Sequence, residues 1–191
     1  MVNPESNLTG KMLIAMPGMR DPRFEHSVIL VCAHSDEGAM GLVVNRPLPD
    51  VDFGELLAQL GIDAHEAALD IPVRFGGPVE PGRGFVLHRV PEGGALDDSR
   101  MRIGDDLAMS TTRDILEDYA RGTGPQPAVL ALGYAGWGPG QLDHEILENG
   151  WLTSERLDEI IFGADNPGKW RAALKGMGID PLVLSPSAGH A

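Results

Sequence analysis

The stretch Leu130-Ala-Leu-Gly-Tyr-Ala-Gly-Trp-Gly-Pro-Gly-Gln-Leu-Asp-His-Glu-Ile-Leu147 decides the fold, because it contains the change from a buried strand to a helix. The apolar run over residues 128–132 predicts a strand, and the pattern becomes helical from Gln141. Between them we expect a loop with four glycines, Gly133, Gly136, Gly138 and Gly140. Glycine lets the backbone adopt positive φ or lie close to another group. The structural interpretation of this loop is a tight strand-to-helix corner, and the functional interpretation is a ligand or partner pocket at that corner.

The loop and the helix after it offer few chemical groups. A strand, a glycine loop and a helix N-terminus can present N–H groups to an anion. However, the spacing Gly136-Trp-Gly138-Pro-Gly140 is neither a dinucleotide-binding nor a phosphate-loop motif, and no lysine follows. Gln141 and Glu145 are four residues apart and therefore share one helix face. They are either solvated polar groups or part of a site.

Composition limits the classes of protein. A chain of 191 residues with 42% hydrophobic residues predicts one packed domain over residues 1–191, with loose termini at 1–8 and 185–191. The 25 glycines favour a β-rich fold. The formal net charge of −13 and the lack of a basic arm argue against direct nucleic-acid binding. The single cysteine, Cys32, lies in an apolar run and is expected to be a buried, inert thiol.

No segment predicts a membrane association. The N-terminus lacks a charged region followed by an apolar one, and no apolar run approaches ~18 residues. We therefore expect a cytoplasmic protein without a membrane contact.

Hydrophobic patterns predict an α+β fold, with hairpins first and helices concentrated in the second half. The expected strands are residues 11–16, 27–33, 40–44, 73–75, 85–88, 107–109, 128–132 and 151–153. The second and third of these form a predicted hairpin, and 73–75 and 85–88 are candidates to pair. The expected helices are residues 52–60, 112–121, one from 141, 154–162 and one that begins at Asn166. Residues 91–102 are expected to be a loop.

Asp52 and its neighbours form the clearest helix start. Phe53, Leu56, Leu57 and Leu60 share one helix face. Asp52 is the predicted N-cap, and Gly61 is the predicted end.

Other candidate residues are scattered. The six histidines show no metal-binding spacing, so no metal ligands are assigned. His88 closes an apolar strand and is either a satisfied core histidine or a general base. Asn45 and Arg46 follow a buried strand, where Arg46 could clamp an anion or form an ordinary ion pair. No serine lies in a nucleophile elbow, and no catalytic residue is assigned.

Six sequence blocks together resemble the YqgE/AlgH family. The blocks are Leu8-Thr-Gly-Lys-Met-Leu-Ile-Ala-Met-Pro17, Asp21-Pro-Arg-Phe24, Gly41-Leu-Val-Val-Asn-Arg-Pro47, Gly76-Gly-Pro-Val79, Gly84-Phe-Val-Leu-His88 and Gly133-Tyr-Ala-Gly-Trp-Gly-Pro-Gly-Gln-Leu142. The resemblance covers residues 8–184 and implies a single α+β domain around a mixed, barrel-like β-sheet with flanking helices. It also implies a label of transcriptional regulator, through a link to alginate production, without an established biochemical activity. No family catalytic residues or cofactor carry over.

The leading hypothesis is a binding or adaptor module for a small anionic ligand or a protein partner, with an indirect regulatory role. The candidate site comprises Asn45, Arg46, Gly76, Gly77, His88, Gly136, Trp137, Gly138, Gln141 and Glu145. The alternative is an enzyme that acts on a small anionic substrate, with His88 or Glu145 as general base. We expect Trp137 to have one packed face and one exposed edge, close to Asn45, Arg46 and the Gly76-Gly77 turn. We assign no cofactor.

Overall fold

A single curled sheet organises the chain. The computed structural model describes residues 7–90, 96 and 98–184. Its strands are β1 (Met12–Ala15), β2 (Val28–Ser35), β3 (Gly38–Val43), β4 (Val73–Phe75), β5 (Val79–Arg89), β6 (Arg100–Ile103), β7 (Leu107–Ser110), β8 (Ala128–Trp137) and β9 (Trp151–Ser154). Its helices are α1 (Phe53–Gln59), α2 (Arg113–Arg121), α3 (Gln141–Leu147), α4 (Asp158–Phe162) and α5 (Lys169–Gly176). The α+β, single-domain prediction is confirmed.

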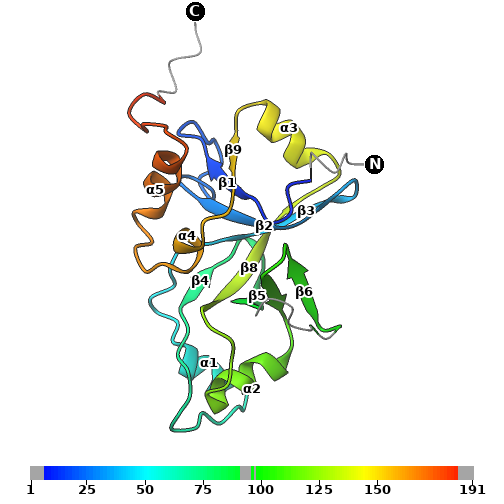
Figure 1. Cartoon of the computed structure of the whole chain (residues 1–191), viewed down its shortest axis with the longest axis vertical. Coiled ribbons are helices and arrows are strands. Elements are labelled where there is room, and N and C mark those ends of the chain that lie inside the picture. Colours follow the sequence, from blue (N-terminus) through cyan, green and yellow to red (C-terminus); the bar gives the residue numbers. More distant parts are fainter. Residues whose placement is uncertain (1–6, 91–95, 97, 185–191) are drawn as a thin grey trace, which may run out of the picture.

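The sheet order places the glycine-rich strand at the centre. The order is β6-β7-β5-β8-β3-β2-β1-β9, and β4 also pairs with β8. All described pairs are antiparallel except β4 with β8, so the sheet is mixed. Figure 1 shows β8 crossing the middle of an elongated molecule, with α3 and α5 at one end and α1 and α2 at the other.

The expected break after Leu132 is wrong, because β8 continues to Trp137. β3 pairs with this second half of β8, from Gly41↔Ala135 to Ala39↔Trp137. Glycine tolerates extended backbone when a neighbouring strand supplies the hydrogen bonds. Positive φ occurs at Gly133 (φ 74°) and Gly140 (φ 68°). Neither Gly136 nor Gly138 adopts it.

The expected pairing of β4 with β5 is also wrong, because they lie on opposite edges of β8. Val73 is in parallel register with Leu130, and Phe85 is in antiparallel register with Ala131. The connection between β4 and β5 therefore crosses β8. It does so at Gly77, where a Cβ would overlap the backbone of Tyr134. The two glycines of the Gly76-Gly77 turn make this close crossing possible.

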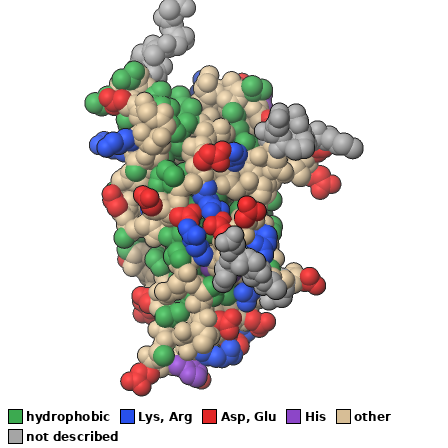
Figure 2. All heavy atoms as spheres, viewed as in Figure 1, with side chains coloured by type: hydrophobic (Ala, Val, Ile, Leu, Met, Phe, Trp, Pro, Cys, Tyr) green, Lys and Arg blue, Asp and Glu red, His purple; other side chains and the backbone are tan. Residues whose placement is uncertain are grey.

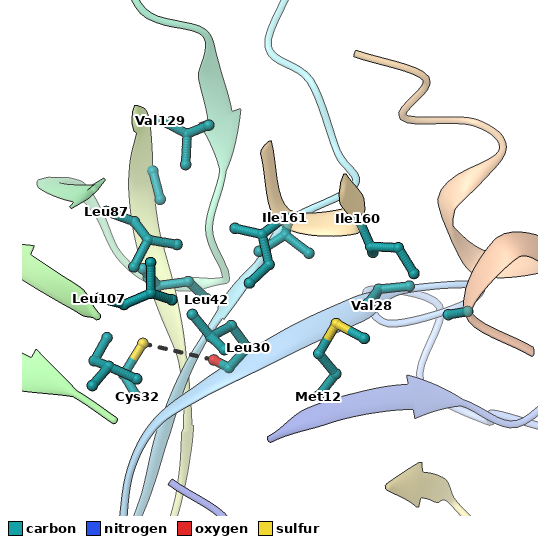
Figure 3. Packing of buried hydrophobic residues seen from close by; sticks show 14 of the residues in the cluster. Met12, Val28, Leu30, Cys32, Leu42, Leu87, Leu107, Val129, Ile160 and Ile161 are labelled. Carbon is teal, nitrogen blue, oxygen red and sulfur yellow. Dashed lines mark hydrogen bonds between the residues drawn. The ribbon is translucent and has the colours of Figure 1, made fainter. Parts of the chain in front are cut away.

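Three hydrophobic clusters stabilise the sheet. The largest, shown in part in Figure 3, joins Met12, Leu30 and Leu87 of the sheet to Ile160 and Ile161 of α4. A second cluster lies under α1 and α2, and a third contains the two indoles Trp137 and Trp151.

Cys32 belongs to the largest cluster, and its thiol lies 3.6 Å from the Leu30 carbonyl oxygen (Figure 3). Burial raises the pKa of the Cys32 thiol to about 12. Because the thiolate is the reactive form, the expected inert thiol fits this setting.

Several helix boundaries differ from the expectations. α4 begins at Asp158, because β9 continues through Ser154. Leu157 and Leu147 were both expected to point inward, but Leu157 is 43% exposed and Leu147 is 81% exposed. α5 begins at Lys169 with Gly168 as N-cap, so Asn166 does not cap it.

The expected loop over residues 91–102 contains β6 at its end. Positions 91–95 and 97 lie outside the described residues. The alternation of Arg100, Met101, Arg102 and Ile103 is the strand signal that could have revealed β6. At the N-terminus, the expected loose lead-in includes Leu8, which packs against the third cluster.

α1 begins as predicted. Asp52 has extended backbone, and its Oδ1 accepts a hydrogen bond from the Glu55 N–H at 2.9 Å. Gly61 ends the helix region with φ 67°, and the Ile62 N–H donates to the Leu57 carbonyl at 2.8 Å. Both termini therefore satisfy backbone groups that a helix leaves unpaired.

We expect Asp52→Ala to lower the free energy of unfolding by about 0.5–2 kcal/mol, because it removes the acceptor for an N-terminal N–H of α1. The measurement is a urea denaturation midpoint. Asp63→Ala, an exposed carboxylate beyond the helix, is the matched control and should leave the midpoint unchanged. Equal midpoints for all three proteins would contradict the capping role.

Candidate functional site

A cavity of about 700 Å³ opens between the end of β8, the loop after β1 and the connection from α3 to β9. Its volume lies within the range of small-ligand sites. It is lined by Gly18, Met19, Arg20, Asp21, Arg23, Phe24, Pro78, Val79, Gly136, Trp137, Gln141, Glu145, Glu148, Asn149, Gly150 and Trp151. The larger part of one wall comes from residues 18–24, and α3 supplies the facing polar groups.

Glu145 and two indoles form the base of this cavity. Oε2 of Glu145 accepts hydrogen bonds from Nε1 of Trp137 at 2.9 Å and from Nε1 of Trp151 at 2.8 Å. The two rings meet edge to face, with centroids 6.0 Å apart. Trp137 is 7% exposed and Trp151 is 2% exposed. A carboxylate that joins two buried rings fixes the relative position of β8, α3 and β9.

Gln141 extends this polar network toward the glycine corner. Its Nε2 donates to Oε1 of Glu145 at 2.8 Å, and its Oε1 accepts from the Gly138 N–H at 3.0 Å. The expected shared face of Gln141 and Glu145 is therefore present, and both oxygens of Glu145 have donors. Gly138 ties the corner to the first turn of α3.

Asn45 and Arg46 hold the loop that forms the opposite wall. The Asn45 amide accepts from the Val28 N–H and donates to the His26 carbonyl, both at 2.9 Å. Nη2 of Arg46 donates to the Glu25 carbonyl, also at 2.9 Å. Neither residue lines the cavity, so they position its wall instead.

The charges at the cavity are mixed. The lining includes three carboxylates and two guanidiniums. Arg23 binds Asp21 through Nε and Nη2, with a shortest distance of 2.7 Å. The hydrogen bond from Arg23 holds the pKa of Asp21 below its ordinary value. Arg20 is exposed, and Glu148 lies 3.4 Å from the exposed His144 imidazole.

Among the sequence candidates, Gly136, Trp137, Gln141 and Glu145 line the cavity together. Gly76 and Gly77 do not line it, but they bring the next residue, Pro78, to its rim. The expected half-exposed Trp137 differs from the structure, where its ring is mostly buried. Sequence reasoning missed Met19, Phe24 and Trp151. Trp151 could have been found from its place at the start of a strand directly after the helix that carries Glu145.

His88 lies elsewhere, in β5, and does not line the cavity. Its ring is 1% exposed, with Nε2 at 3.0 Å from the Ser110 hydroxyl and Nδ1 at 3.0 Å from the Arg89 carbonyl. Burial lowers the pKa of the His88 imidazole below its ordinary value. This is the satisfied core histidine that the sequence left as one of two interpretations.

Neither a metal cluster nor a membrane helix occurs in the part of the chain that the structure describes. Over residues 7–90, 96 and 98–184, no group of three His, Cys, Asp or Glu side chains is placed to hold an ion. No helix within those ranges is long and apolar enough to cross a membrane.

Two buried cations connect the C-terminal helices to the sheet. Arg74 of β4 is 1% exposed and Lys169 of α5 is 3% exposed. Both donate to the carbonyl oxygens of Val44 and Ile161, and Arg74 also donates to Gly163. Burial, with the neighbouring Arg74 charge, lowers the pKa of the Lys169 ammonium to about 7, although Asp165 opposes the shift.

This pKa predicts that the protein becomes more stable between pH 7 and 8.5. In that window an unfolded chain keeps the Lys169 proton while the folded chain releases it, so the free energy of unfolding rises with pH. We expect a gain on the order of 1–2 kcal/mol, measured from denaturation midpoints in urea. Lys169→Met should flatten this dependence on pH, because it removes the group that titrates. Arg74 still donates hydrogen bonds to the shared carbonyl oxygens in this variant. Lys175→Met, exposed on the same helix, should retain it. A rise that survives in Lys169→Met would assign the effect to another group.

Fold and cavity together define a class: a single-domain α+β protein whose curled sheet carries a lined cavity at the end of its central strand. The AlgH-like family model, DUF179, matches residues 12–182. A UPF0301 protein of Paracoccus denitrificans is 80% identical over 190 residues, which cover 100% of each chain. One from Ruegeria pomeroyi is 56% identical and covers 97% of this chain and 100% of its own.

The chain belongs to the AlgH-like family, as the resemblance predicted. The solution structure of AlgH from Pseudomonas aeruginosa aligns with a TM-score of 0.77 at 40% identity, covering 100% of this chain and 99% of that one. A crystal structure of a Corynebacterium diphtheriae protein aligns with a TM-score of 0.71, covering 93% and 91%. At 23% identity, this second likeness concerns the fold alone.

Proposed function

We propose that this protein is a cytoplasmic binding module that recognises a small ligand or a segment of a partner protein in the cavity beside Trp137. The observation that carries the proposal is the preformed cavity whose base, Trp137–Glu145–Trp151, is locked by hydrogen bonds. A concave site with fixed aromatic and polar groups is typical of recognition, because little ordering is needed when a ligand binds.

The charges of the site change the expected ligand. An anion was expected from the glycine corner, but the cavity carries more carboxylates than guanidiniums. One guanidinium, Arg23, is already paired with Asp21. A neutral or cationic ligand therefore suits the lining better than an anionic one.

The enzyme alternative is not favoured by the positions of its two proposed bases. His88 lies outside the cavity and is buried against Ser110. Glu145 lines the cavity, but its carboxylate accepts from three structural donors. A general base must reach the proton it removes, and these contacts occupy the group that would do so.

We expect a regulatory role of this protein to act through the bound partner rather than through direct DNA contact. The net charge is −13. On the face shown in Figure 2, Lys and Arg side chains are interspersed with Asp and Glu side chains rather than gathered in one basic area. Phosphate binding requires locally concentrated positive charge.

The test uses the three indole N–H groups as reporters. Two of them, on Trp137 and Trp151, donate to Glu145 at the cavity. The third, on Trp170, donates to the Ala15 carbonyl at 2.8 Å in the main core and is an internal control. We would titrate nitrogen-15-labelled protein with a library of soluble small-molecule fragments and, separately, random octapeptides. Binding in the cavity should shift the Trp137 and Trp151 signals and leave Trp170 unchanged.

Gly136→Val is the matched control variant. The nearest atoms to a Cβ at Gly136 are the Tyr134 ring edge at 3.4 Å and a Val79 methyl at 3.9 Å, both at ordinary contact distance, so the fold should accept a side chain that projects into the cavity. The shifts should disappear in this variant. If neither library moves the Trp137 and Trp151 signals, or if shifts persist equally in Gly136→Val, the cavity is not a binding site.

A further inference from the structure

The second half of β8 has an edge without a strand partner. On one edge, β3 pairs from Gly41↔Ala135 to Ala39↔Trp137. On the other edge, β5 begins only at Val79↔Tyr134. Within the described ranges, no strand pairs with that second edge beyond Tyr134. This open edge faces the cavity, because Pro78, Val79 and Gly136 are among its lining residues.

The backbone of Gly136 points its hydrogen-bonding groups to this open edge. A Cβ on Gly38 of β3 would overlap the Trp137 carbonyl oxygen, so that oxygen faces β3. The N–H and C=O groups of successive residues in a strand point to opposite edges. Those of Gly136 therefore face away from β3, and Gly136 is exposed to solvent.

The surroundings of Gly136 leave room for an added chain. The three nearest atoms to a Cβ there belong to the Tyr134 ring and the Val79 side chain, at 3.4 to 3.9 Å, and none of them is backbone. Val79 is 36% exposed at the rim, where it offers an apolar contact. Met19 and Phe24 line the opposite wall. An open strand edge inside a groove that also offers apolar contacts is the arrangement that strand addition uses.

Charge selects the kind of chain that fits. Glu148 is exposed at the rim, Glu145 lies at the base, and Asp21 is already neutralised by Arg23. Arg20 is the opposing charge. With a net charge of −13, the whole molecule attracts basic partners over long range.

We propose that the cavity binds an extended, basic segment of a partner protein, which adds as a strand to the open edge of β8 at Gly136. This inference rests on the proposed function and specifies its partner. Main-chain hydrogen bonds to Gly136 supply affinity, and the groove walls select the side chains.

The first experiment tests the peptide backbone and leaves the protein unaltered. Octapeptides selected from the random library by the indole shifts would be remade with single N-methyl groups at successive positions. Strand addition at Gly136 predicts that methylation of the one peptide residue whose N–H donates to the Gly136 carbonyl weakens binding about three- to tenfold, whereas methylation of the residues on either side of it does not. Selected peptides should be rich in Lys and Arg, and their affinity should fall with added salt.

The second experiment changes the edge itself. Gly82→Ala, which lies outside the cavity and places a Cβ with nothing within 4 Å, is the control and should bind the selected peptides within about threefold of the original protein. Gly136→Pro removes the N–H that faces the groove and should weaken them about tenfold. Unchanged Trp170 signals would show that the Pro variant remains folded; if it does not, the N-methyl series alone decides.

The outcomes separate the two proposals. If fragments shift Trp137 and Trp151 but no octapeptide does, the cavity is a small-ligand site and strand addition is wrong. Peptides whose binding is weakened by N-methylation at no single position, or that carry acidic residues, would also overturn it. If neither library binds, both proposals fall.

Discussion

Gly77→Ala is expected to lower the free energy of unfolding by about 4 kcal/mol or more, a large share of the ~5–15 kcal/mol that stabilises a typical domain. The turn that joins β4 to β5 passes directly over β8 at this residue. A Cβ on Gly77 would overlap the Tyr134 carbonyl group and the Ala135 nitrogen. All of these atoms are backbone in the middle of the sheet, so none can move aside without breaking strand pairs.

Gly82→Ala is the matched control, because no atom lies within 4 Å of a Cβ at that position. The urea denaturation midpoint of Gly77→Ala, followed by circular dichroism, should lie well below that of Gly82→Ala. If Gly77→Ala were as stable as Gly82→Ala, the crossing could not be as close as the structure has it.

Trp137→Ala should cost on the order of 3–5 kcal/mol, as do other truncations of buried aromatic side chains. The indole is 7% exposed and packs edge to face on Trp151. Its loss also removes one of three donors to the Glu145 carboxylate. The remaining cavity would be wide enough to admit water beside Trp151, which lowers the stability of α3 on the sheet.

Trp137→Phe is the smaller truncation. It keeps an aromatic ring but removes the N–H together with part of the indole's buried volume, so we expect a loss of about 1–3 kcal/mol in urea denaturation, less than for Trp137→Ala. A loss within about 1 kcal/mol for Trp137→Ala would instead describe a rim residue, whose effect would appear in binding.

The sequence predicted most elements, because periodicity and capping are local. The β2–β3 hairpin and the Asp52 cap follow from neighbouring residues. The relative positions of β4 and β5 could not be predicted in this way, because β8, which comes much later in the chain, lies between them. No local pattern reveals a strand inserted from a distant segment. The glycines of residues 133–140 suggested a loop for a similar reason: Gly133 and Gly136 lie within β8, and the partner that extends β8 past Tyr134 is β3, from a distant part of the chain.

Some of the candidate residues lie together in the structure. Gly136, Trp137, Gln141 and Glu145, which are close in the sequence, line one cavity, whereas Gly138 does not line it. Asn45 and Arg46 were expected to contact a ligand, but in the structure their side chains form hydrogen bonds that hold a loop. Their hydrogen bonds go to backbone groups of residues 25–28, and sequence patterns do not show which backbone a side chain will meet. His88 was included because an imidazole can act as a general base, but in the structure its side chain is buried outside the cavity.

The crossing at Gly77 also sets an order of events during synthesis. β4 and β5 leave the ribosome well before β8, yet neither reaches its central partner until β8 has emerged. Nascent chains that end at Arg121 should therefore expose the apolar faces of β4 and β5 and depend on chaperones. Protease resistance of arrested chains should rise only once Trp137 has cleared the exit tunnel. In this fold, β8, from the last third of the chain, joins the strands that the first two thirds supply into one sheet.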